Sequence, residues 1–273
     1  MDILEYYQLK EQPFRISPDP RFLYLSDQVK EALGKVQYMT AERIGPLYLY
    51  GPIGAGKTSI MRRLYERLQD DERNQVVLLI APNVHSANAF LRMVMDAFSV
   101  KTERSYVASL KNFEIFLAEQ YRAGRVPVLL VDEAQNLSRD VLKLVHYLLN
   151  YETETAKLLQ IVLAGQEELA VKVMRYRELA SRMFPIAMSA MTPDELNEMI
   201  AFRWLVAGGT DSSPFTPESL RELYGASKGL PRDAVKLADE TVRTLFFRHQ
   251  KVASAALMHE LARTLNLGGP VRG

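Results

Sequence analysis

Residues 47–58 read LYLYGPIGAGKT, and this stretch decides the fold. The first four residues form an apolar run typical of a buried strand. The next eight, Gly51 to Thr58, fit the phosphate-loop pattern of a glycine, four variable residues, a second glycine, a lysine and a hydroxyl residue. In such a loop the backbone N–H groups and the start of the following helix attract phosphate oxygens. The stretch therefore predicts a nucleotide-phosphate site between a strand and a helix.

The phosphate loop predicts ATP and Mg²⁺ as the cofactors. Lys57 is expected to reach the β- and γ-phosphates, and the Thr58 hydroxyl is expected to bind Mg²⁺. A chance glycine-rich turn is the alternative, but it does not explain the strand before the loop and the amphipathic helix expected after it. The predicted nucleotide-binding residues of this stretch are Gly51, Pro52, Ile53, Gly54, Ala55, Gly56, Lys57, Thr58 and Ser59.

A second apolar run, VLLV at 128–131, ends in the acid pair Asp132-Glu133. Asp132 is expected to help hold Mg²⁺, and Glu133 to polarise the attacking water as a general base. An acidic loop after a strand is the plain alternative. The pair favours ATP hydrolysis over simple nucleotide binding.

A third run, LLQIVL at 158–163, is followed by Ala164-Gly165-Gln166. The side chain of Gln166 is predicted to sense the γ-phosphate or to hold the water. A glutamine that only satisfies a turn is the alternative.

Short apolar runs alternate with amphipathic segments between residues 47 and 189, which predicts a parallel sheet with helices on both faces. The expected strands are 47–50, 76–80, 126–131, 158–163 and 184–189. The expected helices are 57–69, 86–98, 109–123 and 138–149. The fold class is therefore α/β, with a parallel five-stranded sheet.

The strand pattern stops near residue 190. Thr192-Pro-Asp-Glu195 and Thr216-Pro-Glu are helix starts, because each places a capping hydroxyl before a proline. Helices are expected over 193–207, 217–226, 231–248 and 253–265. The predicted organisation is an extended N-terminal segment (1–26), whose prolines oppose helix, an α/β core (27–190), a helical lid (191–267) and a flexible tail (268–273).

Composition narrows the class of protein. The 273 residues carry 34 basic and 33 acidic side chains and no cysteine, so disulfide frameworks and thiolate metal sites are excluded. No apolar run has the roughly 18–20 residues that span a bilayer, and residues 1–14 do not resemble a secretory signal. A cytoplasmic protein without a membrane segment is expected.

These motifs together resemble AAA+ ATPases: a strand and phosphate loop, DEAQ at 132–135, a polar strand tip, and GLPR at 229–232 in the helical lid. Within them, PFRISPDPRFLYLS at 13–26 and LLQIVLAGQEEL at 158–169 are similar to the ExeA group, which belongs with the transposition regulators TniB, TnsC and MuB. Secretion-type ExeA proteins continue into a membrane span and a peptidoglycan-binding region, whereas this sequence stops after the lid. The resemblance therefore favours a stand-alone, transposon-encoded regulator of the TnsC type, with a truncated secretion ATPase as the alternative.

The resemblance implies further site residues. Phe22, Leu23 and Tyr24 would lie near the adenine, unless they only pack in the core. Arg232 would contact the γ-phosphate from the lid, unless it is a surface residue at a helix start. An arginine finger from a neighbouring subunit is expected before the last strand, with Arg182 as first choice, ahead of Arg177 and Arg175.

The resemblance also implies DNA contacts that read phosphates rather than bases. The candidates are Arg92, Lys101, Thr102, Arg104 and Lys111. A solvated polar loop is the alternative, and Glu103 weakens the patch. Cations multiplied around a ring or filament would still bind DNA in a salt-sensitive way.

The predicted function is an ATP-dependent regulator of transposition that oligomerises on double-stranded target DNA and recruits a transposase together with a target-selection protein. The alternative is an ATPase that energises a secretion or envelope complex. A third possibility is a nucleotide-gated scaffold that hydrolyses very little ATP.

Overall fold

The computed structural model describes residues 2–17, 19–210 and 213–267. The chain divides into two compact units: Met1–Ser26, Pro52–Ser59 and Ser189–Gly273 in one, and Asp27–Gly51 and Ile60–Met188 in the other. The second unit is the α/β unit, and the first is the helical unit. The phosphate loop, which the sequence assigns to the α/β core, groups with the helical unit because the Arg232 N–H donates to the Gly54 carbonyl at 3.2 Å.

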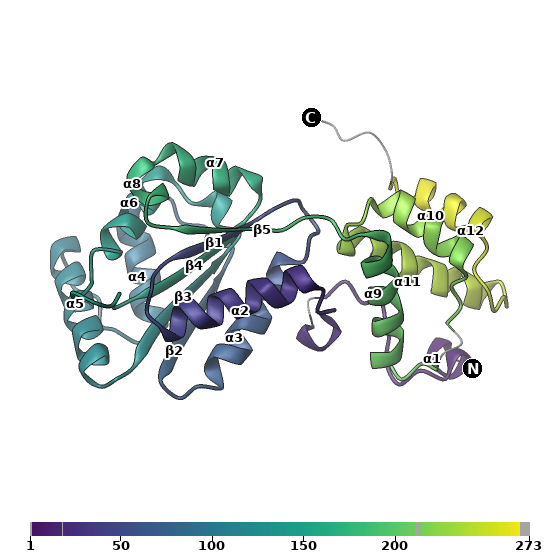
Figure 1. Ribbon diagram of the computed structural model, residues 1–273, viewed down its shortest axis with the longest axis horizontal. Coiled ribbons are helices and arrows are strands. Elements are labelled where there is room, and N and C mark those ends of the chain that lie inside the picture. The colour runs from purple at the N-terminus through teal and green to yellow at the C-terminus, as the bar shows by residue number, and fades with distance from the viewer. Residues whose placement is uncertain (1, 18, 211–212, 268–273) are drawn as a thin grey trace. The chain divides into compact units, whose positions relative to one another are not determined.

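The α/β unit contains one five-stranded parallel sheet (Figure 1). The strand order is β2-β3-β4-β1-β5. The strands are β1 Leu47–Tyr50, β2 Asn74–Ile80, β3 Val126–Asp132, β4 Gln160–Gly165 and β5 Phe184–Ala187. The predicted fold class is confirmed, and each strand lies within a few residues of its expected place.

The sheet register brings the functional strand ends to one edge. Tyr50 of β1 pairs with Gly165 of β4, and Val131 of β3 pairs with Leu163 of β4. Because the strands are parallel, their carboxyl ends share an edge, where α/β proteins bind ligands. The chain leaves this edge into the phosphate loop after β1, into Glu133 after β3 and into Gln166 after β4.

Helices cover both faces of the sheet. They are α2 Asp27–Ala41, α3 Lys57–Gln69, α4 Ala87–Ala97, α5 Tyr106–Arg122, α6 Arg139–Leu148, α7 Glu167–Arg175 and α8 Arg177–Ala180. Strand residues alternate between faces, and Leu129 and Val131 enter a core that also holds side chains of α4, α5, α6 and α7. Helices α2 and α3 lie together along the other face, where Arg67 donates to the Gln37 side chain (Figure 1). Helices α7 and α8 are not among the helices that the sequence predicts.

Four helices build most of the helical unit: α9 Pro193–Val206, α10 Pro217–Ser227, α11 Pro231–Phe247 and α12 Ala255–Thr264. The predicted starts are present, since the side chains of Thr192 and Thr216 cap α9 and α10. Leu196, Ile200 and Trp204 of α9 are buried in the shared core. No helix in the described ranges is both long and apolar enough to cross a membrane.

The N-terminal segment is less extended than expected. It contains a short helix, α1 Ile3–Tyr7, and a 3-10 turn, η1 Pro20–Phe22. Helix α1 forms because Asp2 and Glu5 make a reciprocal capping box before the first proline. Tyr7 then packs edge-on against Trp204, with ring centres 5.7 Å apart. Pro18 and the predicted flexible tail, 268–273, lie outside the described residues.

Candidate active site

The phosphate loop has the backbone conformation that its glycines allow. Gly54 and Gly56 have φ values of +86° and +90°, a region that residues with side chains rarely adopt. An ideal Cβ on Gly56 would meet no heavy atom within 4 Å, so this side of the loop is open. Lys57 begins α3 and is buried, and its Nζ donates a 2.8 Å hydrogen bond to the Pro52 carbonyl. The loop therefore curls around its own lysine ammonium.

Arg232 lies against the phosphate loop. It is the second residue of α11, after Pro231, and a Cβ built on Gly54 would come within 3.2 Å of the Arg232 Cβ. The structure thus brings together two elements that the sequence separates by more than 170 residues. The exposed Arg232 guanidinium belongs to the same compact unit as the loop.

The acid pair lies at the carboxyl end of β3, a strand whose residues are all buried. Asp132 is the last residue of β3 and is only 2% exposed, and its Oδ1 accepts a 2.9 Å hydrogen bond from the Glu133 N–H. Glu133 has φ +55° and ψ +33°, a left-handed conformation uncommon for a residue other than glycine. This conformation ends the strand at Asp132. The half-buried Glu133 side chain therefore points in a different direction from the one it would have if the strand continued.

Gln135 connects the acid pair to the tip of β4. Its Nε2 donates a 2.6 Å hydrogen bond to the Glu133 carboxylate, and its Oε1 accepts a 3.1 Å hydrogen bond from the backbone N–H of Gln166. Gln135 belongs to the DEAQ stretch, but it is not among the site residues predicted from the sequence. Gln166 is half-buried at the strand tip, as predicted, but its backbone rather than its side chain makes this contact.

The three residues predicted to line the adenine differ in environment. Phe22 is buried in the core of the helical unit, which fits the alternative of core packing. Tyr24 is half-exposed, its ring lies 5.9 Å from that of Phe202, and its hydroxyl donates to the Glu198 carboxylate. Leu23 is also half-exposed. Leu23 and Tyr24 thus remain the better candidates for contacting a base.

The arginine-finger candidates also differ. Arg182 is half-buried and donates to the Asn150 side chain. Burial lowers the pKa of His146, and the positive charge of Arg182 lowers it further. Arg177 begins α8 and is exposed, as is Arg175 at the end of α7. Arg182 is therefore the most strongly held within its own chain.

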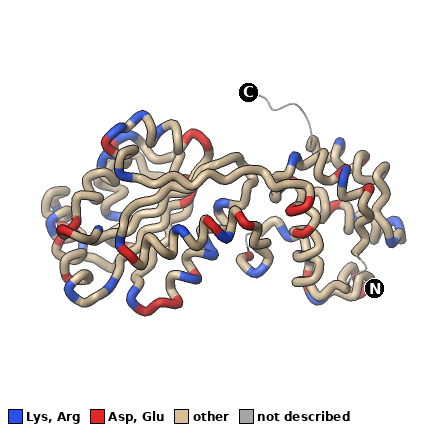
Figure 2. The backbone as a smooth tube through the Cα atoms, viewed as in Figure 1, with Lys and Arg blue, Asp and Glu red and all other residues tan. Residues whose placement is uncertain are grey.

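The predicted DNA contacts lie on α4, α5 and the loop that joins them, where acidic and basic residues are mixed (Figure 2). Lys101 lies 3.8 Å from the Glu103 carboxylate, and Arg92 donates to the Glu103 carbonyl at 3.5 Å. Arg104 is exposed, and Thr102 is half-buried. The loop is therefore partly neutralised within the chain.

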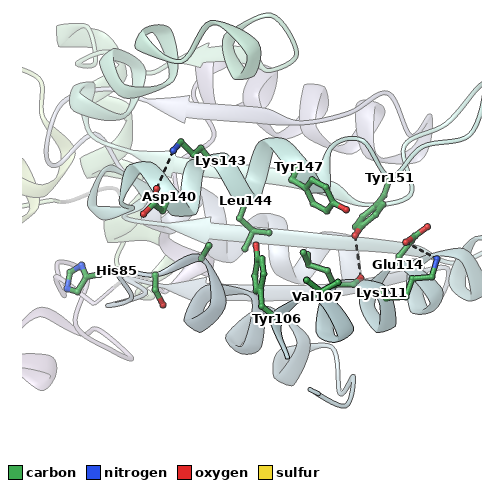
Figure 3. Close-up of a pocket in the computed structure, with 13 residues that line it drawn as sticks. His85, Tyr106, Val107, Lys111, Glu114, Asp140, Lys143, Leu144, Tyr147 and Tyr151 are labelled. Carbon is green, nitrogen blue, oxygen red and sulfur yellow. Dashed lines mark hydrogen bonds and ion pairs between the residues drawn. The ribbon is translucent and has the colours of Figure 1, made fainter. Parts of the chain in front are cut away.

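Lys111 belongs to a different setting. It pairs with Glu114 at 3.2 Å on the rim of a pocket with a volume of about 650 Å³ (Figure 3). Tyr106, Tyr147 and Tyr151 line this pocket with apolar side chains of α5 and α6. Lys111 thus lines a pocket with aromatic walls and is not part of a row of basic side chains.

Comparison with known proteins agrees with this geometry. Residues 41–173 match the family model described as an AAA domain. This part of the chain is therefore similar to AAA domains. It contains the phosphate loop, the acid pair and Gln166, whereas Phe22, Arg182 and Arg232 lie outside it.

The protein is similar to General secretion pathway protein A of Aeromonas hydrophila, with 32% identity over 251 residues. The match covers 89% of this chain and 45% of that protein, so the chain spans less than half the length of this relative. The match favours the secretion alternative over the transposition regulator that the sequence analysis put first.

Solved structures share the fold of the AAA domain and its helical partner. Aeropyrum pernix ORC2 matches with a TM-score of 0.65 at 14% identity and covers 87% of this chain and 67% of that one. The Thermotoga maritima RuvB Holliday junction branch migration motor matches with a TM-score of 0.61 at 17% identity, covering 89% and 70%. At such low identity these likenesses establish the P-loop ATPase fold alone.

Proposed function

We propose that this protein hydrolyses ATP to ADP and phosphate in an Mg²⁺-dependent reaction, and uses the cycle to drive assembly of a secretion or envelope complex. The observation that carries the ATPase part is that a phosphate loop begins directly after β1, while Asp132 ends β3 and Glu133 follows it, and both strands end at one edge of a parallel sheet. The secretion part rests on the 32% identity to General secretion pathway protein A.

The residues present fit Mg²⁺·ATP. The open side of the phosphate loop at Gly56 leaves space for phosphate oxygens, and Lys57 lies buried in the loop as a counter-charge. Magnesium sites in ATPases use one or two protein oxygens with substrate phosphates and water, so no larger acid cluster is needed.

Each residue then has a defined part in the reaction. The backbone N–H groups of the phosphate loop and the Lys57 ammonium bind the phosphates, and Thr58 and Asp132 hold the metal. Bound Mg²⁺ supplies charge neutralisation on the phosphate oxygens. Glu133 accepts a hydrogen bond from the attacking water and orients it as general base. Arg232, near the start of α11, contacts the γ-phosphate.

An oligomer completes the proposed site. An arginine from a neighbouring copy would stabilise the charge of the transition state, so turnover would require assembly into a ring or filament. Arg177 is exposed and available to a neighbour, whereas Arg182 must first leave Asn150.

The test combines three proteins in one assay. Wild type should release phosphate from Mg²⁺·ATP, Lys57→Ala should lose nucleotide binding, and Glu133→Gln should bind ATP without turnover. Produced in the native cell, Glu133→Gln should trap its complex and reduce secretion into the medium, with Lys57→Ala as the non-assembling control. If the wild type hydrolyses ATP but the Glu133→Gln variant leaves secretion unchanged, the ATPase assignment stands and the secretion role is excluded.

A further inference from the structure

We propose that Gln135 is a positioning residue, which fixes the Glu133 carboxylate and couples it to the tip of strand β4. The proposal rests on the proposed function, in which Glu133 is the general base. Gln135 itself would touch neither the nucleotide nor the attacking water. It would act through two hydrogen bonds, one to the Glu133 carboxylate and one from the backbone N–H of Gln166.

The first bond restrains the base. The 2.6 Å contact from Gln135 Nε2 reaches the Glu133 Oε2 atom, so one carboxylate oxygen is held and the other is left for a water. A glutamate side chain has three rotatable bonds, so a free carboxylate samples many orientations. Holding the carboxylate in one orientation favours catalysis, because the reacting atoms must be placed within a few tenths of an ångström. The left-handed backbone of Glu133 already limits its position, and Gln135 limits its orientation.

The second bond ties the same amide to β4. Gln166 follows the last residue of β4 and precedes α7, and its N–H donates to Gln135 Oε1 at 3.1 Å. A carboxamide can donate with one end and accept with the other, which a carboxylate or a thioether of similar size cannot do. A shift of the strand tip therefore moves the amide, and the amide moves the base.

The surrounding chain holds Gln135 in this position. Residues Ala134–Asn136 form the 3-10 turn η2, and Lys172 of α7 donates to the carbonyls of Gln135 and Leu137. Gly165 provides the space, since a Cβ built there would lie 2.8 Å from Gln135 Oε1. Turn, helix and strand tip thus fix the amide from three sides.

Two substitutions separate the two bonds. Gln135→Met keeps the length of the side chain and removes both bonds. Gln135→Glu keeps an oxygen for the Gln166 N–H but cannot donate to Glu133, and it places a second carboxylate beside the base. Gln120→Met is the matched control, because Gln120 lies on α5 and its side-chain oxygen accepts a 3.5 Å hydrogen bond from Arg125.

We expect kcat of both Gln135 variants to fall about 10- to 100-fold, with KM for ATP changed less than about twofold, because ground-state binding is untouched. In nucleotide-free protein, exchange of the Gln166 amide hydrogen should speed up at least about fivefold in Gln135→Met and stay near wild type in Gln135→Glu. Gln120→Met should match wild type in both measurements.

The outcomes distinguish this proposal from the proposed function. Wild-type kcat in both Gln135 variants, in a protein whose Glu133→Gln variant is inactive, overturns the positioning role and leaves the ATPase intact. A raised KM with unchanged kcat also overturns it. No hydrolysis by wild type overturns the proposed function and the positioning role together. If Gln135→Met fails to fold, Gln135→Glu alone tests the proposal. A lower kcat with a wild-type exchange rate of the Gln166 amide supports it, and a wild-type kcat overturns it.

Discussion

The Nη1 atom of Arg203 donates a 3.2 Å hydrogen bond to the backbone carbonyl of Phe22, and its guanidinium lies 5.1 Å from the centre of the Phe22 ring. The same side chain donates to the carbonyls of Pro13 and Arg15 at 3.0 and 2.9 Å. Burial lowers the pKa of Arg203 to about 10, so it remains a cation at neutral pH. One side chain of α9 therefore holds three points of the N-terminal segment, including the part expected near the adenine.

Replacing Arg203 with Met should release this segment. Removing three charge-assisted hydrogen bonds leaves the part-buried carbonyls of Pro13 and Phe22 without this donor, and we expect the free energy of unfolding to fall by about 2–4 kcal/mol. Residues 13–17 should become a site of limited proteolysis. Arg221→Met on α10, where the exposed guanidinium pairs with Glu218 at 3.1 Å, is the control and should change stability by less than about 0.5 kcal/mol. Equal protease resistance of both variants would contradict the anchoring role.

Gly165→Ala should impair turnover without abolishing nucleotide binding. The added Cβ would lie 2.8 Å from Gln135 Oε1 and 2.9 Å from the Leu169 side chain, so Gln135 must move. We expect kcat to fall and stability to drop by about 1–3 kcal/mol, the usual cost of overpacking. Gly225→Ala in α10 is the matched control, because its Cβ meets nothing within 4 Å and should be neutral or slightly stabilising. Thermal melting and steady-state kinetics measure both effects.

Acidification should weaken the fold through His146. Burial lowers the pKa of its imidazole, and the positive charge of Arg182 lowers it further. The negative charge of Glu178 acts in the opposite direction and raises it. The unfolded chain then binds this proton more readily than the folded one, so the stabilisation is present above the ordinary histidine pKa of about 6.5 and is lost as the pH falls below it. Urea unfolding between pH 5 and 8 should show this slope in wild type and less of it in His146→Gln.

The same histidine reports on Arg182. Removing the guanidinium in Arg182→Ala should raise the pKa of His146 towards its ordinary value, whereas Arg177→Ala should leave it unchanged. Proton NMR of the imidazole signals measures the shift, with His146→Gln assigning the resonance. An unchanged His146 titration in Arg182→Ala would show that the two side chains do not meet in solution.

Subunit mixing should identify the arginine finger. If Arg182 acts on the neighbour's nucleotide, Arg182→Ala mixed with Glu133→Gln should regain part of the ATPase activity, because one type of interface pairs an intact arginine with an intact glutamate. The same mixture with Arg177→Ala tests the exposed alternative. Mixtures as inactive as either parent, despite proven co-assembly, would exclude the arginine in question.

DNA binding separates the secretion proposal from the transposition alternative. Because the Glu103 carboxylate lies beside Lys101 and offsets its charge, we expect no tight, ATP-analogue-dependent binding to either of two unrelated duplexes. Fluorescence anisotropy across a salt series measures this. Salt-sensitive binding to both duplexes, weakened equally by Lys101→Ala/Arg104→Ala, would instead support backbone contacts of the predicted kind.

The features that could be predicted from the sequence are those that depend on local backbone chemistry. Glycines at 54 and 56 permit left-handed φ, continuous apolar runs form strands buried on both faces, and threonine before proline starts a helix. These requirements act over a few residues, so the phosphate loop, the acid pair, the sheet and most helices could be predicted.

Tertiary structure alone decided which distant side chains meet. Gln135 and Gln166 are 31 positions apart, and Arg203 and Phe22 are 181 apart. Nothing in the pattern around Gln135 shows that its amide reaches both a carboxylate and a strand tip, because that geometry depends on how β3 and β4 pair and how α7 packs on the turn. Partners at such separations are set by chain topology and packing, which no local pattern records.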